Sequence, residues 1–170
     1  MSNFLVTSGN IDDIDDITRL YRAVAAIEGG LARTAEEVSD EYVTNFVSKS
    51  IETGIIVVAK TVDGKIIGEI HGYALGPKVF AHILGELTIA VHPDFQGRGV
   101  GKIMFIEFMC RIEEQRTDIV RVELTARESN AKAIAFYEKL GFVIEGRMTN
   151  RIRSVSGGFE SDIPMAWLRS

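Results

Sequence analysis

The sequence contains a single cysteine, Cys110, and only three histidines. One cysteine cannot form a disulfide within the chain, so the fold does not depend on a disulfide framework, and we expect a reducing cytoplasm. Cys110 lies in the apolar stretch IMFIEFMCRI. There we expect a small buried hydrophobic residue rather than a nucleophile, because no histidine or helix start is evident beside it. The histidines and the cysteine show no ligand spacing, so we expect no metal.

Long apolar runs and an excess of positive charge are also absent. No apolar run reaches the roughly 18 residues that a membrane span requires, and the first residues do not resemble a signal peptide. We therefore expect neither a membrane span nor a secretory leader. The formal net charge of −5 at pH 7 argues against nucleic acid as the main partner. Acidic residues gather at 12–16 and 36–41; such runs are typical of solvated helix faces, although either could steer a cationic substrate.

Composition and periodicity predict one domain of mixed α/β (α+β) class over residues 1–170. The chain is 46% hydrophobic and 25% charged, close to the globular average, and has no internal repeat or low-complexity linker. Apolar and alternating runs predict strands at 3–9, 54–62, 65–75, 82–91, 118–126, 142–154 and 159–168, and helical periodicity predicts helices at 11–27, from 34 onward, at 100–115 and at 130–141.

Short local signals mark several of these boundaries. Thr34 and Glu37 have the spacing of a capping box, so we expect the second helix to begin at Thr34. Asp63–Gly64 is typical of a hairpin turn, and the SGG stretch at 156–158 predicts the turn of a closing hairpin. Gly141 stands at the usual C-cap position of the last helix.

The stretch HPDFQGRGVGK at 92–102 places three glycines between a predicted strand and a predicted helix. Glycine in a structured segment costs backbone entropy, so this spacing suggests that a ligand approaches the backbone closely. Free N–H groups and the dipole at a helix start favour an anion, and bare Cα atoms let phosphate oxygens come near. Arg98 and Lys102 add positive charge. We expect a pyrophosphate here; the alternative is that the glycines only form a tight turn.

Two common phosphate-binding signatures fail on specific residues. A nucleotide-triphosphate loop would need Ser or Thr after Lys102, where Ile103 stands. A G-x-G-x-x-G fingerprint starting at Gly97 or Gly99 would need glycine in place of Lys102 or Met104. A protein that binds ATP or NAD therefore stays only as a rival interpretation.

Gln96, Gly99 and Gly101 match the pattern Gln/Arg-x-x-Gly-x-Gly/Ala, which resembles the signature of the GCN5-related N-acetyltransferase (GNAT) family. The stretch VELTARESNAKAIAFYEKLGFVIEG, with Asn130 and Tyr137, resembles the family's second conserved block. The resemblance runs from about Ile11 to Leu168. It implies a mixed, mostly antiparallel sheet of about six to seven strands flanked by about four helices. It also implies acetyl-CoA as cosubstrate, with its pyrophosphate on Gln96, Gly97, Arg98, Gly99, Val100, Gly101 and Lys102.

Asn130 and Tyr137 are seven residues apart, so on a helix they share nearly one face. Acetyl transfer from sulfur to an amine releases a thiolate, which a nearby phenol can protonate as general acid. The resemblance implies this role for Tyr137 and cofactor contacts for both residues. The alternative for Tyr137 is a core tyrosine packed beside Phe136.

The resemblance further implies that the strand before the glycines splays from its neighbour. The main chain of Ile89, Ala90 and Val91 would then lie beside the pantetheine arm and the acetyl carbonyl, whose developing negative charge a backbone N–H can stabilise. His92 is typical of a strand end rather than of a catalyst.

The general base is less clearly marked. Glu86 is the best candidate, because strand alternation sets Glu86, Thr88 and Ala90 apart from the face of Leu87, Ile89 and Val91 and could turn the carboxylate toward the substrate. A solvated strand glutamate is the alternative. Glu123 is the reserve candidate, and Glu69 and His71 are weaker. Family members that acetylate ribosomal proteins carry a glutamate where Thr125 stands here, which argues against transferring their base to this chain.

The acceptor is expected to be a small molecule with a primary amine. By resemblance, the loop between the first two helices lines the acceptor site, where Glu28 could meet an ammonium and Arg33 a carboxylate. The C-terminal segment resembles bacterial members that acetylate amino acids or related amines and that often form homodimers. A protein N-terminus or an antibiotic as acceptor, and a non-catalytic acyl-CoA sensor, are the alternatives.

Overall fold

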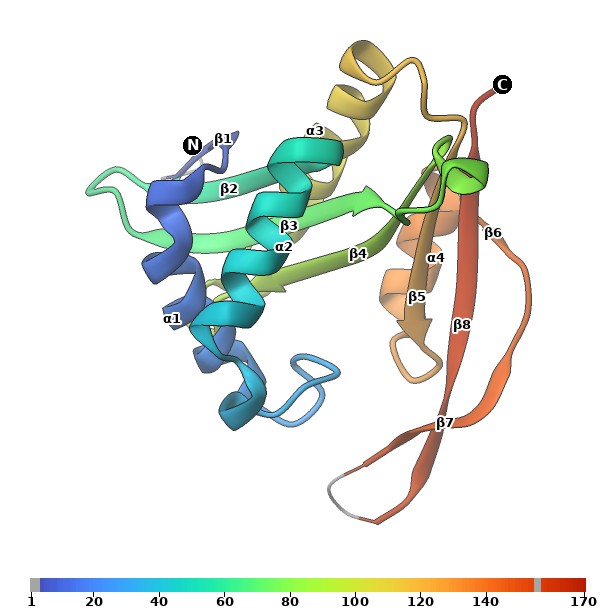
Figure 1. The fold of residues 1–170 in the computed structure, drawn as a ribbon. Helices are drawn as coiled ribbons and strands as arrows, with labels where there is room; N and C mark the ends of the chain where they lie inside the picture. Colours follow the sequence, from blue (N-terminus) through green and yellow to red (C-terminus); the bar gives the residue numbers. More distant parts are fainter. Residues whose placement is uncertain (1–3, 155–156) are drawn as a thin grey trace.

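The computed structural model describes residues 4–154 and 157–170, which form an eight-stranded sheet in the order β1-β2-β3-β4-β5-β8-β6, with β7 also paired to β8 (Figure 1). Neighbouring strands are antiparallel except for β4 and β5, which are parallel. The predicted mixed, mostly antiparallel sheet is therefore confirmed. The strands are β1 (Phe4–Ser8), β2 (Ile55–Thr61), β3 (Ile66–Ala74), β4 (Ile83–Val91), β5 (Arg121–Arg127), β6 (Val143–Ile144), β7 (Met148–Arg153) and β8 (Phe159–Leu168).

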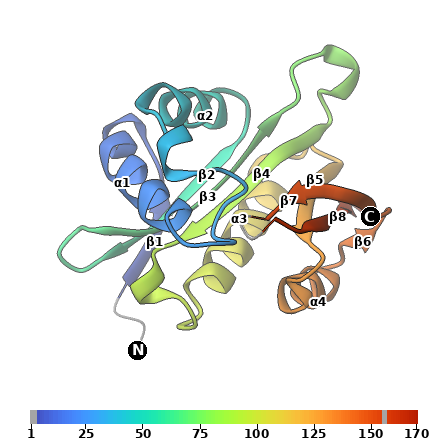
Figure 2. The same cartoon turned by 90° about the horizontal axis from the view of Figure 1, so that it is seen from below.

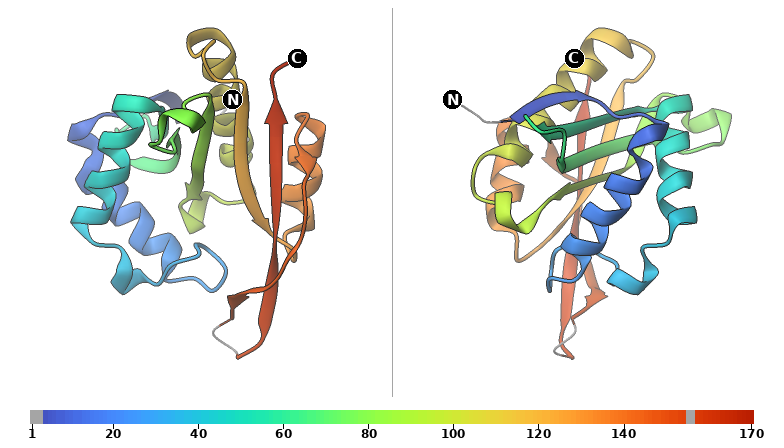
Figure 3. Two further views of the ribbon diagram at one scale, coloured as in Figure 1. Left: turned by 45° about the vertical axis from the view of Figure 1, so that its right-hand side comes forward. Right: turned by 90° about the vertical axis from the view of Figure 1, so that its left-hand side faces the viewer.

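Helices cover both faces of the sheet, with α1 and α2 on one side and α3 and α4 on the other (Figures 2 and 3). This arrangement explains why β2 is a continuous apolar run: Ile56 and Val58 pack toward α1 and α2, while Ile55 and Val57 join the core beneath α3. The helices are α1 (Ile14–Ala25), α2 (Asp40–Thr53), α3 (Val100–Gln115) and α4 (Ala131–Lys139), with short 3-10 turns at Ile11–Asp13, Ala35–Glu37, Lys78–Phe80 and Pro93–Phe95.

The second helix begins later than predicted. The capping box between Thr34 and Glu37 forms, but it caps the 3-10 turn Ala35–Glu37. Val38 leaves helical geometry with φ −82° and ψ 81°, and Ser39 then caps α2 by accepting a hydrogen bond from the Tyr42 N–H. The prediction that α2 starts at Thr34 is therefore wrong. Of the predicted SGG turn, residue 156 lies outside the described residues.

Cys110 is exposed, which corrects its prediction as a buried residue. Helix α3 buries Met104, Phe105 and Phe108 against the sheet. At about 100° per residue, Cys110 falls on the opposite side, in line with Ile103 and Ile106. Those isoleucines are 41% and 39% exposed, so apolar residues on this side of α3 misled the prediction.

Strands β4 and β5 pair over only two positions, Ile83 with Arg121 and Leu84 with Val122. Beyond them β4 stays with β3, while β5 follows β8 from Arg121 to Arg127. The two parallel strands therefore diverge toward their carboxyl ends, as the family resemblance implies. Residues beyond the pairing keep main-chain groups on the facing edges, and the glycine-rich loop and α4 follow directly from the diverging ends.

Among the described residues, no helix is both long and apolar enough to cross a membrane.

Candidate active site

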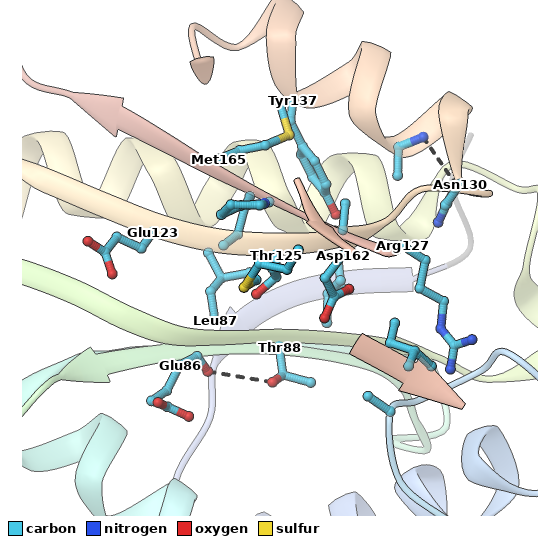
Figure 4. A pocket seen from close by; sticks show the side chains of 18 of the residues that line it. Glu86, Leu87, Thr88, Glu123, Thr125, Arg127, Asn130, Tyr137, Asp162 and Met165 are labelled. Atoms are coloured by element: carbon cyan, nitrogen blue, oxygen red, sulfur yellow. Dashed lines mark hydrogen bonds between the residues drawn. The ribbon is translucent and has the colours of Figure 1, made fainter. Parts of the chain in front are cut away.

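A cleft of about 610 Å³ opens between the diverging strands β4 and β5 (Figure 4). Its walls come from β4, β5, α4, the strand pair β7–β8 and the loop between α1 and α2. Four residues predicted from the sequence to take part in the reaction line it: Glu86, Ile89, Asn130 and Tyr137. The fold thus assembles segments that lie far apart in the sequence.

The glycine-rich loop follows the end of β4 and leads into α3. Gly97 and Gly99 have φ of +72° and +81°, a left-handed conformation that strains other residues, so backbone geometry by itself favours glycine there. A Cβ built at either position would meet nothing within 4 Å. The side chain of Gln96 holds the loop to the strand end, because its Nε2 donates to the Val91 carbonyl at 3.0 Å.

The start of α3 offers free backbone donors beside this loop. Gly99 is the N-cap residue, and no described side chain accepts a hydrogen bond from the first turn of α3. Arg98 and Lys102 are exposed on either side of the cap. Gly101 would tolerate alanine, since its added Cβ would lie 3.4 Å from Val91 Cγ2. These features suit an anionic group, for which unpaired N–H donors and two cations are available.

The last residues of β4 alternate between the two faces, as predicted. Leu87, Ile89 and Val91 pack toward the core beneath α3, whereas Ala90 is buried on the side of α1 and α2. Beyond Leu84 this strand has no pairing with β5 among the described residues. The main chain near Ile89 pairs with β3 on one edge, and its other edge borders the cleft without a strand partner among the described residues.

Tyr137 combines the two interpretations considered for it. Its ring packs within the core, with centroids 4.9 Å from Phe105 and 6.0 Å from Phe142, while its hydroxyl points into the cleft (Figure 4). Burial raises the pKa of the Tyr137 phenol, so the group stays protonated at neutral pH. It can therefore act as a proton donor.

Asn130 is the N-cap of α4 rather than a residue within the helix. Its Oδ1 accepts a hydrogen bond from the Ala133 N–H at 3.2 Å, which leaves the amide NH₂ for the cleft. Asn130 and Tyr137 thus reach the cleft from the start of α4 and from its second half.

Glu86 is exposed and has an unusual backbone conformation, with φ of +51°. Strand β4 holds one extra residue here, because His71 pairs with Thr88 but Tyr73 pairs with Gly85. Glu86 borders both the cleft and a smaller neighbouring pocket. Glu123, the reserve base, also lines the cleft, but its carboxylate accepts a hydrogen bond from Arg121 Nε at 2.6 Å.

The smaller pocket, which we call the acceptor pocket, has a volume of about 200 Å³. Arg33 lines it, with its guanidinium 3.9 Å from the centre of the Tyr42 ring. Glu28 is exposed and is not among the described residues that line either space. The lining residues are Leu31, Ala32, Arg33, Tyr42, Phe46, His71, Tyr73, Glu86 and Thr88.

Sequence reasoning missed the aromatic lining of the acceptor pocket. Tyr42 and Phe46 come from α2 and Tyr73 from the end of β3, and each fits its own element as an ordinary apolar position. Nothing local in the sequence distinguishes them, because they meet only when α2 packs on β3.

Comparisons with known proteins agree with this geometry. The family model of the acetyltransferase (GNAT) domain matches residues 52–144. A ribosomal protein bS18 alanine N-acetyltransferase of Salmonella typhimurium is 39% identical over 87 residues, which cover 49% of this chain and 57% of the relative. This chain thus matches little more than half the length of that relative.

Solved structures resemble the whole fold. A structure of yncA from Salmonella typhimurium with its cofactor acetyl-CoA has a TM-score of 0.82 at 18% identity, covering 98% of this chain and 94% of that one. The ribosomal protein S18 alanine N-acetyltransferase from Escherichia coli has a TM-score of 0.76 at 24% identity, covering 98% and 94%. Because the family model matches more than half of the sequence, the chain belongs to the GNAT family of acetyl-CoA-dependent N-acetyltransferases.

Proposed function

We propose that this protein transfers an acetyl group from acetyl-CoA directly to a primary amine, without an acyl-enzyme. The observation that carries the proposal is the cleft between β4 and β5, which combines the Tyr137 hydroxyl with main chain left unpaired by the divergence. In a family that uses acetyl-CoA, this arrangement suits a thioester held along β4. The exposed Cys110 lies on the outer side of α3 and has no role in the transfer.

The cofactor would lie from the glycine-rich loop into the cleft. Its pyrophosphate would rest on the backbone from Gln96 to Lys102, where the free donors of the α3 start and the two cations favour negative charge. The pantetheine arm would follow the main chain of Ile89, Ala90 and Val91. Asn130 would meet the arm from the opposite wall with its free amide.

The chemistry requires proton movements at two atoms. As the amine nitrogen bonds to the carbonyl carbon and the C–S bond breaks, Tyr137 would donate its proton to the departing sulfur. A backbone N–H near Ile89 would stabilise the negative carbonyl oxygen. Glu86 would attract the substrate ammonium and accept a proton from it, directly or through water.

The acceptor would be a small amine that also carries a carboxylate, such as an amino acid. Arg33 and Glu86 give the acceptor pocket one positive and one negative side chain, which suit a carboxylate and an ammonium. Tyr42, Phe46 and Tyr73 would contact an apolar side chain. In this arrangement Glu86 takes the place that the sequence suggested for Glu28.

A protein N-terminus is the second candidate acceptor. It is favoured by the relative that is 39% identical and is named for acetylating alanine of ribosomal protein bS18. Two features favour a small amine instead. Thr125 stands where family members that acetylate ribosomal proteins carry a glutamate, and the acceptor pocket is small.

Two measurements test the proposed function. Thermal unfolding with acetyl-CoA, ATP or NAD at about 100 times the dissociation constant should show stabilisation by acetyl-CoA alone, of roughly 2.7 kcal/mol. For a chain of this length the shift is about 5–10 °C. A panel of the standard L-amino acids, their decarboxylated amines and a peptide with N-terminal alanine, followed by CoA release, then identifies the acceptor. Stabilisation by ATP or NAD instead would contradict the proposal.

A homodimer and a cytoplasmic location also stay predictions. The β7–β8 hairpin extends beyond the body of the sheet and exposes Phe159, which suits a contact between two copies (Figure 3). Light scattering after size exclusion measures the mass directly, and a monomer at all concentrations would contradict the dimer.

A further inference from the structure

A buried hydrogen-bonded group lies beneath the acceptor pocket and has no part in the function proposed above. Glu69 is 0% exposed and His71 2%, and Tyr21 from α1 is also 0% exposed. The Tyr21 hydroxyl donates to Glu69 Oε2 at 2.5 Å, and His71 Nδ1 lies 3.0 Å from Glu69 Oε1. We call these three residues the buried triad.

The contacts of the triad decide which nitrogen of His71 carries hydrogen. Burial and the neighbouring Glu69 raise the pKa of Tyr21 well above its usual value, so this phenol stays protonated and donates a hydrogen bond to Glu69. The Glu69 carboxylate can then only accept. His71 Nδ1 must therefore be the donor, which leaves Nε2 with a lone pair when the ring is neutral.

The free nitrogen is available to the acceptor pocket. His71 lines that pocket, and no described residue forms a hydrogen bond with its Nε2. The ring is held between Phe46, whose centroid is 4.1 Å away at an interplanar angle of 11°, and Tyr73 at 6.0 Å and 7°. Stacking and the bond to Glu69 thus fix both the tautomer and the orientation of the ring.

We propose that His71 accepts a proton from the acceptor amine, with Glu69 and Tyr21 as the residues that position it. This inference rests on the proposed function. Two protons must leave an ammonium before the amide is complete: one before attack, and one after nitrogen has bonded to carbon. In the overall balance, one of these two protons replaces the proton that Tyr137 donates to sulfur, and the other is released to water. Glu86 at the pocket's edge accepts one and His71 Nε2 the other.

Charged and uncharged groups surround His71. Histidine is the side chain that most often serves as a general base in enzymes. The charged groups around His71 are Glu69 on β3, Glu86 on β4 and Arg33 at the pocket. The uncharged neighbours are Tyr21 from α1, Tyr42 from α2, Tyr73 from β3 and Thr88 from β4.

The first test needs no acceptor. The sequence has only three histidines, so long-range ¹H–¹⁵N spectra can assign the ring of His71 apart from His82 and His92. Above its pKa, His71 should carry hydrogen on Nδ1 and none on Nε2, and Glu69→Gln should disturb this tautomer because its amide can donate to Nδ1. Hydrogen on Nε2 in the wild type, or a ring that stays doubly protonated through neutral pH, would overturn the proposal.

The second test uses the L-amino acid that the panel shows to be acetylated fastest. His71→Asn keeps a donor near the place of Nδ1 but lacks Nε2. It should lower kcat by about 10²-fold or more and should remove one ionisation from the profile of kcat against pH. His82→Asn, which changes an exposed histidine on the loop before β4, is the matched control.

Acetyl-CoA stabilisation separates failure of this inference from failure of the proposed function. His71→Asn should keep the thermal shift of the wild type with acetyl-CoA, because His71 packs on the face of the sheet that α1 and α2 cover, whereas the glycine-rich loop leads into α3 on the other face. A wild-type kcat and pH profile in His71→Asn would overturn the inference while leaving the proposed function intact. If acetyl-CoA caused no thermal shift in the wild type, the proposed function would be contradicted. The spectra of His71 would still show whether Nδ1 or Nε2 carries hydrogen.

Discussion

Tyr137 belongs to both the core and the cleft, and the proposed function gives it a chemical role. Its ring packs against Phe105 and Phe142, away from water. The same burial raises the pKa of the phenol and keeps it protonated where a thiolate would form. The aromatic packing fixes the ring, and the ring in turn aims the hydroxyl. Removing only the oxygen therefore separates chemistry from packing.

Tyr137→Phe should lower kcat by about 10²-fold, since a positioned general acid contributes about 10²–10⁴-fold. The affinity for acetyl-CoA, measured by titration calorimetry, should stay close to that of the wild type because the ring and its contacts remain. Phe136→Leu is the control, as it alters the neighbouring packing without touching the hydroxyl. An unchanged kcat in Tyr137→Phe would favour the non-catalytic sensor over the enzyme.

Gly99→Glu should abolish the thermal shift with acetyl-CoA. The substitution places a carboxylate at the start of α3, where the pyrophosphate is expected, and the two negative charges repel. It also strains the backbone, because φ is +81° at this residue. Gly99→Ala carries the same strain, of about 1–2 kcal/mol, without the charge, so it should lose stability yet keep part of the shift. A wild-type shift in Gly99→Glu would contradict the placement of the pyrophosphate.

At the scale of elements, the carboxyl end of α3 depends on an arginine from the last residues of the described chain. Arg169 donates to the carbonyls of Ile112 at 3.0 Å, Arg116 at 3.1 Å and Ile119 at 2.8 Å. Arg169 also donates to the Glu113 carbonyl at 3.3 Å, in the last turn of α3, where a helix leaves carbonyls without backbone donors. Its positive charge also opposes the negative end of the helix dipole. The contact fastens the end of β8 to the helix that begins at the glycine-rich loop.

Arg169→Met should therefore lower the free energy of unfolding by about 1–3 kcal/mol, measured by urea denaturation, because several carbonyls lose a charged donor. Arg19→Met removes an exposed arginine that pairs with Asp16 on α1, and it should change stability by less than about 0.5 kcal/mol. Equal effects of the two substitutions would show that Arg169 does not fasten the helix.

Elements with strong local signals could be predicted from the sequence, and contacts between elements could not. The helix at 100–115 has the bounds predicted for it, because Gly99 and the apolar period mark its start and course. The prediction of a buried Cys110 is wrong, because this helix carries apolar residues on its exposed side as well as on its buried side. The predicted start of α2 at Thr34 is wrong because the Thr34–Glu37 capping box caps a separate 3-10 turn. The acceptor pocket depends on α2 meeting β3, which no local pattern records.

At the scale of the whole molecule, both binding spaces follow from the way the sheet divides. Strand β5 leaves β4 to pair with β8, which opens the cleft. On the other side of β4, α2 and the loop between α1 and α2 enclose the acceptor pocket. Glu86 and Thr88 border both spaces, so the thioester and the amine would meet at the extra residue of β4. Selectivity for the amine would then be set in part by the loop between α1 and α2, which borders both spaces.

Arg33→Met tests whether this loop sets the selectivity for the amine. For an L-amino acid that the wild type acetylates, the variant should raise KM by about 10-fold or more with a smaller change in kcat, because a hydrogen bond to a charged group contributes about 1.5–3 kcal/mol. For the corresponding decarboxylated amine, KM should hardly change, since that acceptor has no carboxylate for Arg33 to bind. Arg19→Met, with the same loss of charge outside both spaces, should leave both KM values as in the wild type. If Arg33→Met raised KM equally for both amines, Arg33 would act through the shape of the pocket, and the carboxylate of the acceptor would have to be recognised elsewhere.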